Sequence, residues 1–386
     1  MVFEIFDNEA LNLYAIYQSN TKDKAMKINF IFYYVMFLLI VFSCSAEETA
    51  ADTNQNPIID TIYFPPIASS EWNTKSLSDL NWNETELTPL LDFLVEKNSK
   101  SFMILHNGKI VIEQYFNDHT ATSPWYWASA GKTLTTATFG IAQDAGLVTV
   151  ENRVSDYLGV NWTSLPLEKE NLITCQHLLS MTSGLDDTLG EDISPENLQY
   201  IADAGTRWAY HNVYVNLQNI IENASSSNWD SYFNSNLKTK IGMSGQWIAQ
   251  NNSNVYWSNT RSMARFGLLM FANGNWNNTQ ILSVSYINNA TNTSQNINEA
   301  YGYLWWLNGN STYHLPQTQF TFSGSLIPNA PTDMIAALGK NDQKIYIVPS
   351  MDLVIVRMGE SSDESNFGLS TFDAELWDKI NAVINN

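Results

Sequence analysis

The sequence predicts a mixed α/β fold in which one antiparallel sheet is built from both ends of the folded chain and is flanked by helices. Apolar runs rich in β-forming residues occur early, over 102–112, and return late, over 334–357. Between them, from about 160 to 300, the spacing of apolar residues is mostly that of helices and loops. We therefore expect a helical subdomain inserted between the two halves of the sheet. A cleft between the two parts is where small-molecule sites prefer to lie.

Composition restricts the classes of partner. The chain has 386 residues, of which 44% are hydrophobic, and this is enough for one large domain or two ordinary ones. Its formal net charge of -20 repels phosphate backbones, so we expect no nucleic-acid partner. The two cysteines, Cys44 and Cys175, offer no disulfide framework, and the five histidines show no close ligand spacing. We therefore expect neither a metal site nor a cofactor.

The beginning of the chain has the pattern of an export signal preceded by extra residues. Residues 1–25 are polar and mixed, and we interpret them as the product of an upstream start, with translation beginning at Met26. Residues 26–43 contain a lysine, an unbroken apolar run over 30–42 and a small residue before the break, as secretory signals do. The run is too short for a comfortable membrane span, which needs about 20 apolar residues.

Cys44 follows the apolar run directly, and this arrangement resembles the lipobox of bacterial lipoproteins. By that resemblance Cys44 becomes the lipidated first residue of the mature protein, anchored at the cell envelope and facing the periplasm or the exterior. A plain signal peptide and an anchor helix are the alternatives. Residues 44–76 are rich in Ala, Thr, Asn, Pro and Ser, so we expect a flexible tether before a folded domain over 77–386.

The early elements lead up to a helix that looks buried. The spacing of Leu and Phe predicts a first helix over Leu87–Val95. Two β-type runs, Phe102–Leu105 and Ile110–Ile112, flank an Asn-Gly pair, which is a strong hairpin signal. A helix from about Lys132 to Ala145 follows, with Gly146 as its expected C-terminal cap.

The later elements begin with helices and end with strands. We expect Gly184 to close an apolar helix that contains His177. Two amphipathic helices are predicted over Val213–Ala224 and Ser262–Ala272. The last part of the chain is expected to hold three strands and a closing helix, over Met334–Leu338, Lys344–Val348, Leu353–Arg357 and Phe372–Ile384.

The first candidate for chemistry is the pair Ser129 and Lys132. Positions three apart lie on one face of a helix, so the amine can reach the hydroxyl. A serine hydroxyl is a poor nucleophile until a base takes its proton, and a lysine is that base if its surroundings lower its pKa. Ser19 and Ser235 begin the same spacing, but only Ser129 stands between an aromatic loop and an apolar helix.

The second candidate is the segment Tyr210-His211-Asn212, which precedes a predicted helix. A tyrosine beside a lysine can shuttle protons, and an asparagine can hold the lysine and offer its amide to a substrate carbonyl. His211 has either a catalytic role or a hydrogen-bonding place in the lining of the cleft.

Tryptophans are the third group. Trp127 and Trp208 could wall an apolar pocket or pack in the core. Trp305 and Trp306 are adjacent, and neighbours on a strand face opposite ways, so at most one of them should face the cleft. Cys175 is expected to be a buried, inert thiol.

Together these residues resemble the serine β-lactamase and penicillin-binding-protein superfamily. The resemblance rests on Ser129-x-x-Lys132, on Tyr210-x-Asn212 about 80 residues later, and on a late strand with Gly339. It is closer to the class C-like branch, which includes esterases and amidases. Four more stretches support that branch, namely His177–Leu185, Thr260–Gly267, Tyr301–Trp306 and Ile345–Arg357.

The resemblance implies a β-lactamase/transpeptidase-like fold and an acyl-enzyme mechanism. Ser129 would attack a carbonyl, Lys132 and Tyr210 would move the protons, and Asn212 would position the reacting groups. Main-chain N–H groups of Ser129 and of the late strand would form an oxyanion hole. The second of these donors is Lys340 or Asn341, because the strand alignment near Gly339 is ambiguous by one residue.

One departure from the family pattern bears on the substrate. The family's third motif places Lys or His two residues before this glycine, and here no basic residue precedes Gly339. The residue at that place helps family members to hold the carboxylate of a β-lactam. Its absence favours a small-molecule or peptide substrate with a simple ester or amide bond. The alternatives are a β-lactamase or DD-peptidase and a non-catalytic envelope binding protein.

Overall fold

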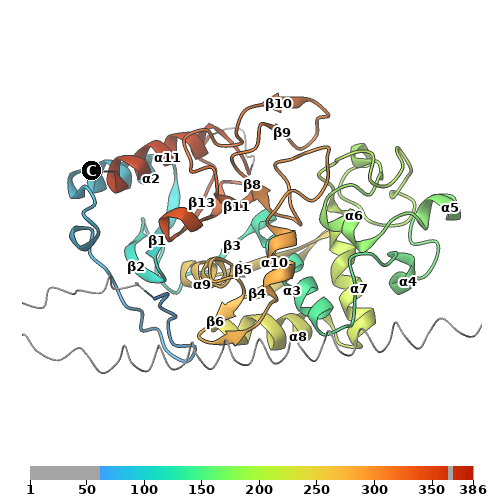
Figure 1. Ribbon diagram of the computed structural model, residues 1–386, viewed down its shortest axis with the longest axis horizontal. Helices are drawn as coiled ribbons and strands as arrows, with labels where there is room; N and C mark the ends of the chain where they lie inside the picture. The colour runs from blue at the N-terminus through green and yellow to red at the C-terminus, as the bar shows by residue number, and fades with distance from the viewer. Residues whose placement is uncertain (1–60, 364–367, 386) are drawn as a thin grey trace, which may run out of the picture. The chain divides into compact units, whose positions relative to one another are not determined.

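A six-stranded antiparallel sheet is formed from both ends of the folded chain (Figure 1). The computed structural model describes residues 61–363 and 368–385, so the predicted export signal, Cys44 and the tether before residue 61 lie outside the described residues. In spatial order the strands are β2 (Lys109–Tyr115), β1 (Ser99–His106), β13 (Leu353–Gly359), β12 (Gln343–Val348), β11 (Ile335–Gly339) and β8 (Trp306–Leu307). The predicted fold class is confirmed.

The hairpin between β1 and β2 forms where the Asn-Gly pair predicts it. Asn107 and Gly108 both have positive φ, 45° and 80°, as two-residue hairpin turns require. Gly108 is also held close to another segment, because a Cβ at this position would lie 1.9 Å from the carbonyl oxygen of Tyr63. The turn therefore needs glycine for its conformation and for its close approach.

Helices cover both faces of the sheet (Figure 1). On one face, α2 (Leu87–Glu96) and α11 (Thr371–Ile384) pack together, with Phe93 stacked on Phe372. On the other face, α9 (Thr260–Phe271) lies so close that a Cβ on Gly267 would be 2.5 Å from the side chain of Val354. Alternate strand residues therefore face different helices. Tyr346 contacts Trp377 of α11, while its neighbour Ile345 lies against α9.

The middle of the chain is richer in strands than its sequence predicts. It contains α4 (Ser155–Leu158), α5 (Leu167–Glu170), α6 (Cys175–Leu179), α7 (Asn216–Ser225), α8 (Trp229–Phe233) and α10 (Val284–Ala290). It also contains a hairpin, which forms a three-stranded sheet with β3 from earlier in the chain. These strands are β4 (Gln246–Gln250), β5 (Ser253–Ser258) and β3 (Trp125–Tyr126). The turn between β4 and β5 contains Asn251, which adopts a positive φ of 50°. Asn is a residue that favours this conformation, and it is the one sign of the turn in the sequence.

Smaller elements complete the domain. The short strands form two two-stranded sheets and are β6 (Asn275–Trp276), β7 (Thr279–Gln280), β9 (Thr312–His314) and β10 (Thr321–Ser323). The short helical turns are η1 (Ser78–Leu80), η2 (Glu84–Glu86), η3 (Ala128–Gly131), η4 (Asp187–Leu189), η5 (Asn212–Val215), η6 (Asn234–Lys238), η7 (Thr239–Ile241) and η8 (Pro349–Met351). The predicted helix from Lys132 is α3 (Lys132–Asp144), and Gly146 follows it with a φ of 72°.

Two helix boundaries differ from their predictions. The helix predicted over Val213–Ala224 begins as the 3-10 turn η5 and becomes α-helical only at Asn216. Gly184 does not close α6, which ends at Leu179. The glycine is needed for another reason, because a Cβ there would lie 2.2 Å from the carbonyl oxygen of Ala202.

Residues 61–76, predicted as the last part of a flexible tether, lie along the domain instead. The buried guanidinium of Arg265 donates to the carbonyl oxygen of Pro66 at 2.8 Å, and Trp72 Nε1 donates to that of Gly108 at 2.7 Å. Thr74 forms a parallel bridge with Ile110 beside the sheet. The guanidinium group of an arginine has five N–H donors and can bind several main-chain carbonyl oxygens at once. The composition of residues 61–76 does not reveal that such contacts form. Among the described residues, no helix is long and apolar enough to cross a membrane.

Candidate active site

Ser129 lies in a tight turn at the head of a buried helix. The turn η3 leads directly into α3, and Ala128 within it has a φ of 47°. A residue with a Cβ rarely adopts this conformation, and it persists where the surroundings enforce it. Lys132 is the first residue of α3, and its Nζ donates to Ser129 Oγ at 2.9 Å. The spacing of the two residues therefore brings amine and hydroxyl into contact as predicted.

Lys132 is buried between aromatic rings. Its side chain is 8% exposed, and Nζ lies 4.8 Å from the ring centre of Tyr210 and 4.4 Å from that of Tyr214. Burial opposes the charged form, but Tyr210, Tyr214 and the carboxylate of Glu191 favour it and together raise the pKa of Lys132 above its ordinary value. A lysine that acts as a resting-state base needs a lowered pKa, and the surroundings of Lys132 do not supply it. At neutral pH Lys132 carries a proton.

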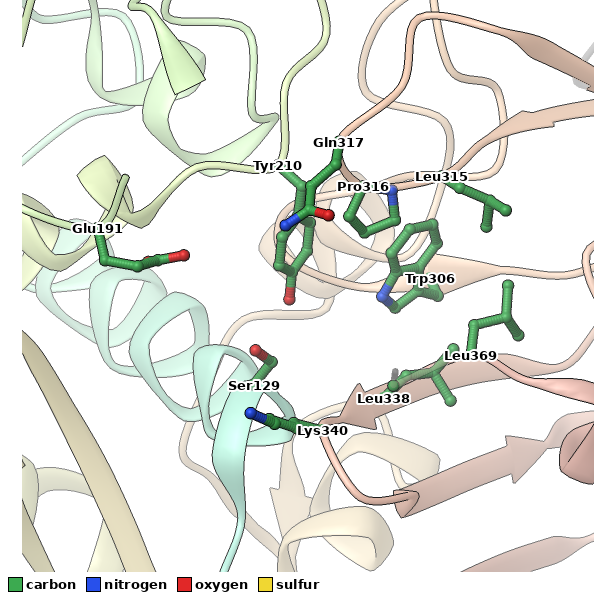
Figure 2. A pocket seen from close by; sticks show the side chains of 11 residues that line it. Ser129, Glu191, Tyr210, Trp306, Leu315, Pro316, Gln317, Leu338, Lys340 and Leu369 are labelled. Carbon is green, nitrogen blue, oxygen red and sulfur yellow. The ribbon is translucent and has the colours of Figure 1, made fainter. Parts of the chain in front are cut away.

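Tyr210 is held by an aromatic cluster with its hydroxyl directed at Ser129. Its ring stacks on Trp306, with 5.9 Å between centroids, and meets Tyr301 edge-on at 6.2 Å. Figure 2 shows the Tyr210 hydroxyl pointing into a cavity towards Ser129. A rigid aromatic support of this kind fixes where the hydroxyl can deliver or accept a proton.

The cavity beside Ser129 has a volume of about 400 Å³ and two chemically different sides (Figure 2). Polar groups surround the serine on one side, from Glu191, Tyr210, Gln317 and Lys340. Apolar side chains form the other wall, from Trp306, Leu315, Pro316, Leu338 and Leu369. An apolar group bound beside a few placed polar groups is the usual arrangement of a small-molecule site.

The end of β11 packs against the turn that carries the serine. A Cβ on Gly339 would lie 2.4 Å from the carbonyl oxygen of Trp127 and 2.9 Å from the main-chain nitrogen of Ala130. Only glycine allows this approach. Lys340, the next residue, lines the cavity together with Ser129, whereas Asn341 donates from Nδ2 to the hydroxyl of Tyr126 at 2.6 Å. Of the two residues proposed as second oxyanion donor, only Lys340 shares the cavity.

Asn212 does not occupy the substrate-facing place that was predicted for it. Its side chain is 3% exposed, and Nδ2 donates to the main-chain oxygens of Glu191 and Asn252, both at 2.8 Å. Both amide protons are therefore used to tie two loops together. This arrangement positions the loop that carries Glu191 instead of presenting an amide to the cavity.

The three residues predicted to line the cleft are buried instead. His211 Nδ1 accepts from the N–H of Val213 at 3.3 Å and so caps η5, and burial lowers the pKa of His211. Trp127 Nε1 donates to Ser258 Oγ at 2.8 Å, away from the cavity. Trp208 packs against the ring of Tyr210 and contributes to its aromatic support. Local sequence does not decide which way such large side chains turn.

The adjacent tryptophans face opposite ways, as predicted. Trp306 lines the cavity, while Trp305 stacks on Phe266 of α9 with 6.0 Å between centroids. Cys175 is a buried free thiol, and burial raises its pKa to about 12. No group of His, Cys, Asp or Glu side chains within 61–363 and 368–385 is arranged to hold a metal ion.

Several cavity residues carry no sequence signal. Glu191 follows Gly190 in an irregular polar loop, and Gln317 lies just before β10. Neither belongs to a motif, and each reaches the cavity only through the path of its loop. Leu338 differs, since it directly precedes Gly339 on β11 and its place follows once that glycine is located.

Comparison with known proteins agrees with this geometry. The Beta-lactamase family model matches residues 94–361. The chain belongs to the beta-lactamase family. The family's serine hydrolases share the mixed fold seen here, with its antiparallel sheet and flanking helices.

Individual known proteins are only distantly similar to this chain in sequence. An uncharacterized protein of Alkalihalophilus pseudofirmus is 26% identical over 304 residues, which cover 68% of this chain and 84% of that protein. A putative beta-lactamase from Bacteroides dorei superposes with a TM-score of 0.63 at 15% identity, covering 79% of this chain and 100% of that chain. A putative 6-aminohexanoate-dimer hydrolase from Bacillus anthracis superposes with a TM-score of 0.62 at 20% identity. The superposition covers 83% of this chain and 89% of that chain. These structural likenesses support the fold.

Proposed function

We propose that this member of the beta-lactamase family is an exported serine hydrolase that forms an acyl-enzyme at Ser129 and cleaves an ester or amide bond. The observation that carries the proposal is the 2.9 Å hydrogen bond between Lys132 Nζ and Ser129 Oγ, at the edge of a cavity that the Tyr210 hydroxyl enters. A purely binding protein would have no use for this set of groups.

In the proposed reaction Lys132 and Tyr210 move the protons. Because Lys132 is protonated at neutral pH, the reactive form is the fraction of sites in which the pair has lost one proton. In that form the pair accepts the proton of Ser129 as Oγ attacks the carbonyl carbon, and then donates it to the leaving group as the ester or amide bond breaks. Water then attacks the acyl-enzyme, and the pair takes and returns a proton in the same way.

Two main-chain N–H groups would stabilise the oxyanion, those of Ser129 and Lys340. Lys340 is favoured over Asn341 because it lines the cavity and because Gly339 brings the end of β11 within contact of the serine turn. Donors aimed in advance at the developing negative charge usually make the largest single contribution to acyl transfer.

The walls of the cavity support an apolar acyl group. Neither residue before Gly339 on β11 is basic: Ala337 comes first, and Leu338, next to the glycine, is apolar and lines the cavity. A substrate whose own carboxylate binds at that place would therefore have its negative charge against an apolar wall. We infer that esters or amides with an apolar acyl group are preferred over β-lactams.

The location of the enzyme is a separate proposal. We infer that Cys44 carries a lipid that anchors the protein to the cell envelope, facing the periplasm or the exterior, with the domain as its soluble part. The test is membrane fractionation of the full chain and of Cys44→Ala. We expect the variant to leave the membrane fraction; an unchanged distribution would contradict the lipid anchor.

Covalent labelling tests the proposed chemistry. Wild type and Ser129→Ala are each treated with a fluorophosphonate and with a fluorescent penicillin, after circular dichroism has shown that both are folded. We expect fluorophosphonate labelling of wild type alone and little penicillin labelling. Strong penicillin labelling that depends on Ser129 would instead support a β-lactamase or DD-peptidase. Absence of any Ser129-dependent label would contradict the proposed enzyme and would favour a non-catalytic envelope binding protein.

A further inference from the structure

Four charged side chains lie buried behind the end of β11, outside the cavity. Lys344 and Arg357 are 0% exposed, and Asp342 and Asp373 are 1% exposed. These four residues are called the buried ion cluster below. Two cations balance two carboxylates, as they must, because charges at this depth are tolerated only when they are paired and hydrogen-bonded. The cluster is not needed to hold substrate, so its position requires another explanation.

Lys344 joins two segments that each border the cavity. Its Nζ lies 3.1 Å from Asp342 Oδ1 and 2.8 Å from Asp373 Oδ2, and it donates to the main-chain oxygen of Gly368 at 2.6 Å. Asp342 ends the turn over 340–342 between β11 and β12, which is called the donor turn below. Gly368 precedes Leu369 in the apolar wall. One ammonium therefore fixes the donor turn relative to that wall.

The main chain of the donor turn is held from behind as well. Arg357 Nη1 donates to the carbonyl oxygens of Asn341 and Asp342 at 3.0 and 2.9 Å. Gln343 Nε2 donates to those of Lys340 and Asn341 at 3.3 and 2.8 Å. Asn341 and Asp342 both have positive φ, 60° and 59°. Asn and Asp adopt this left-handed conformation more readily than other residues with a Cβ, so their side chains suit the turn.

We propose that the buried ion cluster positions the main-chain N–H of Lys340 and the wall at Gly368 in one fixed geometry against Ser129. This inference rests on the proposed function, in which that N–H stabilises the oxyanion. A donor that is fixed before the reaction costs no reorganisation when negative charge develops. The four charged residues are positioning residues, because they act through the donor turn and do not touch the substrate.

Asp342→Asn tests this role with little change of shape. The variant leaves Lys344 paired with Asp373 but removes the charge that draws the donor turn towards Lys344. We expect kcat for p-nitrophenyl butyrate to fall about tenfold or more while KM stays within about threefold. Acylation and deacylation each pass through an oxyanion, so both steps should slow together. A fall in kcat at a nearly constant KM is the result expected when both steps slow equally.

Asp333→Asn is the matched control. Asp333 accepts from the N–H and Oγ of Ser350 at 2.7 and 2.8 Å, at the opposite end of the same strand pair. It therefore caps a turn of the sheet without contact to the cavity, and its loss should leave kcat within about twofold of wild type. Thermal unfolding of both variants separates a loss of stability from a loss of positioning.

Tyr346→Phe provides a second, milder variant. The Tyr346 hydroxyl donates to Asp373 Oδ1 at 2.5 Å, so its removal loosens the cluster without leaving a charge unpaired. We expect kcat to fall about threefold at unchanged KM. Unchanged kcat in folded Asp342→Asn, or in Tyr346→Phe where the first variant does not fold, would overturn the inference. A wild type without turnover and without a Ser129 label would overturn the proposed function instead.

Discussion

The two sides of Ser129 are built in opposite ways. On the helix side, Lys132 and Tyr210 present side chains to Ser129, and Lys132 Nζ lies 2.9 Å from its Oγ. On the strand side, Gly339 and the donor turn present main chain, and the charges that hold them are buried behind the turn. In the proposed mechanism the helix side moves protons and the strand side supplies fixed dipoles.

This difference determines how each side should respond to mutation. The helix side depends on the chemical identity of a few side chains, so a single deletion should remove most of the activity. The strand side depends on the position of main-chain atoms, so changes that displace it should reduce activity in proportion to the displacement. Mutations on the helix side therefore test which side chains are needed, and mutations on the strand side test where the main chain must lie.

The largest effect is expected from Lys132→Ala, which removes the proton carrier on the helix side. We expect kcat/KM for p-nitrophenyl butyrate to fall about a thousandfold or more, since base and proton donor are lost together. The matched control is Lys238→Ala, from the other Ser-x-x-Lys spacing in the domain, whose Nζ donates to the carbonyl oxygen of Gly245. Wild-type rates in Lys132→Ala would mean that the proton is taken elsewhere.

On the strand side, Gly339→Ala should act through position alone. The added Cβ would lie 2.4 Å from the carbonyl oxygen of Trp127, so the end of β11 must move away from the serine turn. We expect kcat to fall by a factor of about 10 to 100, the range for loss of one oxyanion donor or less.

Gly131→Ala is the control for this change. Gly131 also adjoins the serine, but the nearest atoms to an added Cβ lie 3.7 Å away, which is ordinary contact. Its kcat should stay within about threefold of wild type. Equal losses in the two variants would argue against a special role for the strand end.

The pH dependence of the reaction reports the helix side. The pKa of Lys132 is raised, so the deprotonated pair is a minor form that grows about tenfold per pH unit below that pKa. We expect log kcat/KM to rise with a slope near one between about pH 6 and pH 9, after subtraction of the Ser129→Ala background. A plateau that begins near pH 6 would contradict the raised pKa.

The smallest effect is expected from Leu338→Lys, which adds a basic side chain to the apolar wall beside Gly339. We expect kcat/KM for p-nitrophenyl butyrate to fall by a factor of about three to ten, because an apolar contact is replaced by a charge. Labelling by fluorescent penicillin should increase, and Leu338→Met should change neither property. Unchanged penicillin labelling in Leu338→Lys would show that this residue does not exclude β-lactams.

The sheet and its helices could be predicted from the sequence because their signals are local. Short apolar runs of β-forming residues and an Asn-Gly turn identify β1 and β2, and Gly146 marks the end of α3. The hairpin of β4 and β5 was missed, because its Asn251-Asn252 turn lacks the glycine of an Asn-Gly pair and its strands are partly exposed and polar. Binding of residues 61–76 to the domain was also missed, because it depends on Arg265 from a distant helix.

The candidate site was predictable where spacing sets geometry and unpredictable where packing does. A separation of three positions along a helical segment places Lys132 beside Ser129, independently of distant segments. The direction in which Trp127, His211 and Asn212 turn is decided by contacts with distant segments, and each turns away from the cavity. The pKa of Lys132 has the same origin, because Tyr214 and Glu191 come from other elements.

Intact-mass spectrometry of the protein during turnover tests the central claim most directly. The enzyme is mixed with p-nitrophenyl butyrate, quenched in acid within milliseconds to seconds, and weighed, and the modified peptide is then sequenced. The account predicts a transient mass increase of one butyryl group on Ser129, which is absent in Ser129→Ala and disappears as substrate is consumed. Turnover without this adduct, or an acyl group on another residue, would contradict it.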